Sequence, residues 1–100
     1  MSVYSELINL ALEVDQQAER PVGDLVAAAA DFRNHLGRAT DAASRLGDSL
    51  AYDVVLIRLC EKVGISHEIG GDISGIRARQ RAENALVEQL PLFASAVARR

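Results

Sequence analysis

The segment that decides the fold is LAYDVVLIRLCEKV, residues 50–63. An α-helix has about 3.6 residues per turn, and on that repeat apolar side chains cover most of the circumference of this segment. Only a strip near Ala51, Arg58 and Lys62 is expected to contact water. A helix that is apolar on nearly all sides is typical of a protein centre. The segment therefore predicts a central buried helix over about residues 49–63.

Two helices are expected before this segment, because apolar residues recur there every three or four positions. The first covers residues 3–19 and ends before Pro21, which has no amide N–H to donate. Its apolar stripe consists of Val3, Leu7, Leu10 and Val14, widened by Tyr4, Ile8, Ala11 and Ala18. The second begins with Asp24 as its N-cap and ends near Gly37. Its stripe consists of Leu25, Ala29, Phe32 and Leu36.

The residues between Gly37 and the central helix allow two interpretations. Thr40 or Asp41 could cap a short helix that ends at Gly47, after which Asp48 would cap the central helix. Alternatively, one long helix could run through both glycines, because four apolar residues keep the helical register: Ala39, Ala43, Leu46 and Leu50. Each interior glycine costs about 1 kcal/mol relative to alanine, so we favour the broken arrangement.

The C-terminal part predicts a loop and then a helix with one interruption. Gly64 ends the central helix, and glycines at 64, 70, 71 and 75 indicate a connection with one turn around residues 66–69. The last helical stretch begins near Ser74 and restarts at Pro91. Its inner stripe is Ala82, Leu86, Leu90, Phe93 and Val97, and its outer side carries Arg77, Arg81, Asn84 and Glu88. The sequence thus predicts one all-α domain, 1–100, a compact bundle of four to five helices.

Composition excludes several classes of protein. The longest apolar run, 25–30, has six residues, whereas a membrane span needs roughly 20. The net charge is −3, opposite to the balance of most nucleic-acid binders. The N-terminus lacks the basic region of a signal peptide, and the single cysteine cannot form an internal disulfide. We expect a cytoplasmic protein with no membrane segment and no nucleic-acid partner.

Residues 56–75 weakly resemble a degenerate helix-turn-helix, which is the basis of an alternative role as a DNA-linked regulator. Gly64 would occupy the turn and Ser66 would cap the second helix. However, Gly70 and Gly71 would fall inside the recognition helix and together cost about 2 kcal/mol. The carboxylates of Glu68 and Asp72 would also repel phosphate. We therefore expect a helix end followed by a glycine-rich connection.

Asp53 is the most informative single residue, because it lies inside the apolar arc of the central helix. A buried unpaired carboxylate is costly, so an arginine from another helix should neutralise it, or it should face an interface or a cavity. The neighbouring Tyr52 could donate its hydroxyl to a partner group. An ion pair at the edge of the core predicts that Asp53→Leu changes the melting temperature little and leaves the oligomeric mass unchanged.

Other reactive residues have simpler explanations. Cys60, His67 and Asp72 resemble a nucleophile, base and orienting acid, but Cys60 lies on the apolar side of its helix and should be an inert core residue. His35 and His67 are far apart and no HxxxH or CxxC spacing occurs, so we expect both histidines on the surface and no metal site.

The glycine-rich loop and the arginines that follow it raise the question of phosphate binding. Gly70 and Gly71 precede Arg77, Arg79 and Arg81, an outline of an anion cradle. Asp72 opposes an anion there, and Arg79 should instead pair with Glu83 four residues along the helix. We therefore expect no cofactor at this loop.

These patterns favour a non-enzymatic adaptor or self-associating module that acts through an apolar helix face. The stripe over residues 3–18 is wide for so small a core, and a homodimer or another protein would cover the excess. A third possibility is a small helical enzyme or ligand-binding protein built around Asp53, His67 and the glycine-rich loop. The candidate functional residues are Asp53, Tyr52, His67, Arg77 and Arg81.

Overall fold

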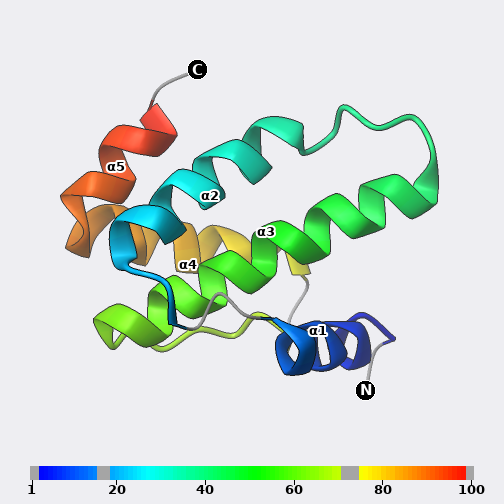
Figure 1. Ribbon diagram of the computed structural model, residues 1–100, viewed down its shortest axis with the longest axis horizontal. Coiled ribbons are helices and arrows are strands. Elements are labelled where there is room, and N and C mark those ends of the chain that lie inside the picture. The colour runs from blue at the N-terminus through cyan, green and yellow to red at the C-terminus, as the bar shows by residue number, and fades with distance from the viewer. Residues whose placement is uncertain (1–2, 16–18, 71–74, 99–100) are drawn as a thin grey trace.

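The computed structural model of the chain describes residues 3–15, 19–70 and 75–98 (Figure 1). Over these ranges the structure contains five helices and no strand. They are α1 (Val3–Val14), α2 (Val22–His35), α3 (Ala42–Val63), α4 (Gly75–Gln89) and α5 (Pro91–Ala98). The expected all-α bundle is therefore confirmed. None of these helices combines the length and the hydropathy that crossing a membrane requires.

Helix α3 is the centre of the bundle, as its sequence predicted. It crosses the molecule between α2 and α1 and also packs against α4, while α5 packs against α2 and α4 (Figure 1). Its buried residues are Tyr52, Asp53, Val54, Val55, Leu56, Ile57, Leu59 and Cys60. Arg58, expected in the wet strip, leaves only 15% of its side chain exposed because it packs against the end of α1.

The connection into α3 differs from both arrangements expected from the sequence. The chain breaks at residues 36–41, where Gly37 has a φ of +78°, but the helix then runs through Gly47 without interruption. Asp41 is the N-cap and accepts a hydrogen bond of 2.8 Å from the Ser44 amide, so Asp48 caps nothing. One interior glycine costs about 1 kcal/mol, whereas a second break would expose further unpaired amide and carbonyl groups.

Helix α1 buries only one side of its predicted stripe, the side that carries Tyr4 and Ile8. The described helix ends at Val14 rather than near residue 19, and residues 16–18 lie outside the described ranges. Ser5 and Ile8 are buried, with Tyr4 and Leu12 partly buried beside them. The other row of the predicted stripe faces solvent: Val3, Leu10 and Val14 are 71%, 59% and 80% exposed, and Leu7 is half-buried.

The remaining boundaries follow local chemistry. Pro21, not Asp24, is the N-cap of α2, and its carbonyl accepts a hydrogen bond of 3.1 Å from the Leu25 amide. Gly64 ends α3 in the left-handed conformation at φ +75°, as expected. The turn expected around residues 66–69 falls at residues 69–70. Pro91 starts α5 as predicted, and Phe93 is buried against the core.

Candidate functional site

Asp53 lies at the centre of a buried polar cluster between α1, α3 and α4. Its side chain is 1% exposed, and Arg79 of α4 holds it with two hydrogen bonds, Nε to Oδ1 at 2.7 Å and Nη2 to Oδ2 at 3.0 Å. The hydroxyl of Tyr4, on α1, donates to Oδ2. An arginine from another helix thus neutralises Asp53, as the sequence predicted. The bidentate geometry is the strongest form of such a pair.

A second group beside it also consists of one carboxylate, one arginine and one tyrosine. Tyr52 donates its hydroxyl to Oε2 of Glu83, and Nε of Arg33 donates to the same oxygen at 3.1 Å. The guanidinium carbon of Arg79 lies 5.5 Å from the centroid of the Tyr52 ring, which joins the two groups through a cation–π contact. The cluster therefore links α1, α2, α3 and α4.

The prediction that Arg79 pairs with Glu83 is wrong, because Arg79 pairs with Asp53 and Glu83 pairs with Arg33. An exposed pair four residues apart on a helix contributes only about 0.5 kcal/mol or less. A buried carboxylate without a partner costs several times more, so Arg79 turns to Asp53 instead. Glu83 is left to accept hydrogen bonds from Tyr52 and Arg33.

Burial controls the protonation of this cluster. The pKa of both Tyr4 and Tyr52 is raised above the ordinary value of a tyrosine. The main cause is desolvation by burial, and the second is the hydrogen bond that each hydroxyl donates to a carboxylate, so both hydroxyls remain protonated donors. Desolvation alone would lower the pKa of Arg79, but its hydrogen bonds and charge interaction with Asp53 outweigh that effect and raise it. The two arginines balance the two carboxylates. Since each carboxylate accepts hydrogen bonds from an arginine and a tyrosine of other helices, the cluster joins α1, α2, α3 and α4.

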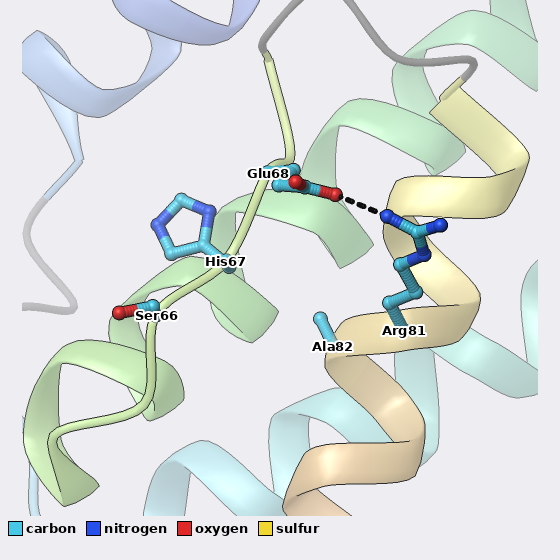
Figure 2. A pocket seen from close by; sticks show the side chains of 5 residues that line it. All are labelled: Ser66, His67, Glu68, Arg81 and Ala82. Atoms are coloured by element: carbon cyan, nitrogen blue, oxygen red, sulfur yellow. Dashed lines mark hydrogen bonds and ion pairs between the residues drawn. The ribbon is translucent and has the colours of Figure 1, made fainter.

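A cleft of about 250 Å³ lies beside the loop that follows α3 (Figure 2). Its lining residues are Ser66, His67, Glu68, Arg81 and Ala82. Arg81 Nη1 is 2.8 Å from Glu68 Oε2, a pair in which both side chains are about half exposed. Figure 2 shows the His67 ring on the other side of the loop from this pair. His67 is half-buried, contrary to expectation, and its Nδ1 has no hydrogen-bond partner among the described residues.

The other candidate residues do not assemble into a reactive site. Cys60 is fully buried, and burial raises the pKa of its thiol to about 11, which opposes a role as nucleophile. Asp72 lies outside the described ranges. Arg77 is exposed on α4 and does not line the cleft. His35 is exposed, and within residues 3–15, 19–70 and 75–98 no group of three or more His, Cys, Asp or Glu side chains could hold a metal.

The helix-turn-helix alternative gains no support from the loop. Its second helix should begin near Ser66, but residues 65–70 are not helical and the next described helix starts at Gly75. Gly70 has a φ of +83°, and a Cβ at this position would lie 3.3 Å from Cγ2 of Ile8 on α1. The loop therefore packs against α1 through a glycine, in a conformation that a recognition helix could not adopt.

The sequence predicted excess apolar surface on residues 3–18, but it did not predict which row of the stripe would face outward. We define the α1 face as Val3, Leu7, Leu10 and Val14, whose spacings of four, three and four align them along one side of the helix. Glu6 and Glu13 are exposed beside this row. The signal in the sequence was the Tyr4 hydroxyl, which donates to Asp53 when the row with Tyr4 and Ile8 faces inward.

Comparison with known proteins found no matching family model, no matching curated protein and no matching solved structure. Function is therefore inferred from the geometry of the described residues. Two features stand out: the buried cluster around Asp53, in which arginine and tyrosine side chains pair the carboxylates, and the α1 face, of whose four apolar side chains three are exposed to solvent.

Proposed function

We propose that this chain is a non-enzymatic interaction module that binds another protein through the α1 face. The observation that carries the proposal is the exposure of three large apolar side chains in one row, Val3 at 71%, Leu10 at 59% and Val14 at 80%. Scattered apolar residues are ordinary on a protein surface, but an aligned row on one helix is typical of an interaction site.

The expected gain on covering this face is moderate. Full burial of a Val or Leu side chain contributes about 1.5–3 kcal/mol, so covering the exposed fractions of these three would contribute roughly 3–6 kcal/mol. Association costs of at least about 4 kcal/mol oppose this gain. A partner must therefore add polar or charged contacts around the face to bind well.

The rest of the bundle holds α1 in position for binding. Tyr4 is bonded to Asp53 near the start of the helix. At its other end, Arg58 donates from Nη2 to the Leu12 carbonyl at 2.9 Å and from Nε to Asp15 at 2.9 Å. A helix that is already ordered pays less conformational entropy on binding, which favours docking on this surface.

A ligand-binding role at the cleft has narrower support. The buried, unpartnered Nδ1 of His67 favours a small molecule with a hydrogen-bonding group. However, the ring points away from the Arg81–Glu68 pair, so the polar groups of the cleft do not converge on one point (Figure 2). The α1 face is the better-supported candidate.

The test uses three helical peptides with the same leucine row, bordered by Lys, Gln or Glu, each with one tryptophan. Because the chain contains no Trp, peptide fluorescence reports binding directly. At least one peptide should bind saturably to the full chain. Leu10→Asp should weaken that binding at least about 10-fold, because it places a charge in the apolar contact.

The matched control is Leu92→Asp on α5, since Leu92 is 53% exposed and Leu10 is 59% exposed. This control should leave the affinity unchanged. If none of the three peptides binds, or if both variants weaken binding equally, the α1 face is not the docking surface.

A further inference from the structure

We infer that the partner on the α1 face is a basic amphipathic helix of another protein. The inference rests on the proposed function and names the class of partner. Residues Val3–Val14 contain two acidic residues, Glu6 and Glu13, and no basic residue. Both glutamates are exposed, and neither forms an ion pair with any part of the chain that the structure describes.

The two glutamates lie on the same edge of the α1 face. They are seven residues apart, which corresponds to two helical turns and about 10.5 Å along the axis. Leu10 lies between them, four residues after Glu6 and three before Glu13. An apolar row at spacings of three and four with acidic residues at a repeat of seven is the arrangement by which paired helices select their partners.

Lysine or arginine residues at a spacing of seven on the partner would therefore face both glutamates at once. They would border the partner's own apolar row, so the same helix would cover the row on α1 and neutralise its acidic edge. This combination adds the charged contacts that the apolar row needs to bind well.

A symmetric pairing of α1 with α1 of a second copy fits this face poorly. In an antiparallel pair of α1 helices, the edge that carries Glu6 and Glu13 would meet the same edge of the second copy, so like charges would be opposed. In a parallel pair, Glu6 would face the position of Ala11, which carries no positive charge. An anionic lipid surface or nucleic acid would be repelled in the same way.

The ranking of the three peptides tests this inference on the full chain. Two exposed ion pairs change affinity by roughly 2- to 30-fold, so the Lys-bordered peptide should bind tighter than the Gln-bordered peptide by that factor. The Glu-bordered peptide should bind weakest. The preference should shrink at about 0.5 M salt, because exposed charges are then screened.

The double variant Glu6→Gln/Glu13→Gln keeps the apolar row and removes the charges. It should bind the Lys- and Gln-bordered peptides equally. If the wild-type chain already binds all three peptides equally, the α1 face is a docking surface but the basic partner is refuted. If no peptide binds, the proposed function fails as well.

Sedimentation of the chain alone tests whether a second copy, rather than another protein, covers the α1 face. A monomer is expected at concentrations where the Lys-bordered peptide is bound. A dimer that Leu10→Asp dissociates and Leu92→Asp does not would assign the face to a second copy and overturn the inference.

Discussion

The buried pair of Asp53 and Arg79 makes a sharp prediction about stability. Replacing Asp53 by leucine leaves the Arg79 guanidinium and the Tyr4 hydroxyl without their carboxylate, in a site where Asp53 is 1% exposed. Breaking a buried pair in this way costs about 3–5 kcal/mol. Because the Arg79 side chain is 19% exposed and can partly rehydrate, we expect a loss of about 3 kcal/mol, at the lower end of this range.

This loss is large enough to measure by thermal and chemical denaturation. A domain of 100 residues gains roughly 0.2 kcal/mol per kelvin in unfolding entropy, so ~3 kcal/mol lowers Tm by about 15 °C. The sequence alone suggested an ion pair at the edge of the core and a small effect of Asp53→Leu. The depth of burial and the third partner, Tyr4, change that expectation. Because the cluster is internal, the oligomeric mass should not change.

Two controls separate the charge effect from loss of packing. The double variant Asp53→Leu/Arg79→Met removes both charges and should recover at least half of the loss, since no unpaired charge remains. Glu68→Gln breaks the exposed pair with Arg81 and should cost less than about 1 kcal/mol. A melting temperature of Asp53→Leu within about 3 °C of the wild type, or a double variant no more stable than the single one, would refute the reasoning.

Three further predictions concern single features of the fold. Gly47→Ala should stabilise the chain by about 1 kcal/mol in urea denaturation, because a Cβ there meets nothing within 4 Å. Gly64→Ala should destabilise it by about 1–2 kcal/mol, because Gly64 has a φ of +75°. Effects of the same sign in the two variants would contradict this contrast. Since the pKa of both Tyr4 and Tyr52 is raised above 10.0, their contribution to stability is complete below pH 10 and decreases as the pH rises beyond it. Replacing both by Phe should flatten that alkaline decrease, and an unchanged slope would oppose the assignment. Cys60 should react with a thiol reagent at least ~10³-fold more slowly in the native than in the unfolded chain, and comparable rates would show that α3 is not the core.

Local patterns in the sequence were sufficient for the helical class and for the helix ends at Gly64 and Pro91. Gly64 and Pro91 act through their own backbone chemistry, which needs no information from distant residues. Local patterns did not predict that the helix continues through Gly47. The low helix propensity of glycine favours a break there, whereas the cost of leaving backbone groups unpaired opposes one. The outcome depends on packing along the whole of α3, which no local window contains.

The sequence by itself determined that the chain is helical and that residues 49–63 lie at its centre, because a helix that is apolar on nearly all sides must be covered by several neighbours. The tertiary structure decided which face of α1 points inward. Val3, Leu7, Leu10 and Val14 fit the helical repeat as well as Tyr4, Ile8 and Leu12 do, so periodicity could not choose between the two rows. The buried carboxylate of Asp53 favours the row that brings it the Tyr4 hydroxyl, a contact across 49 positions of the chain.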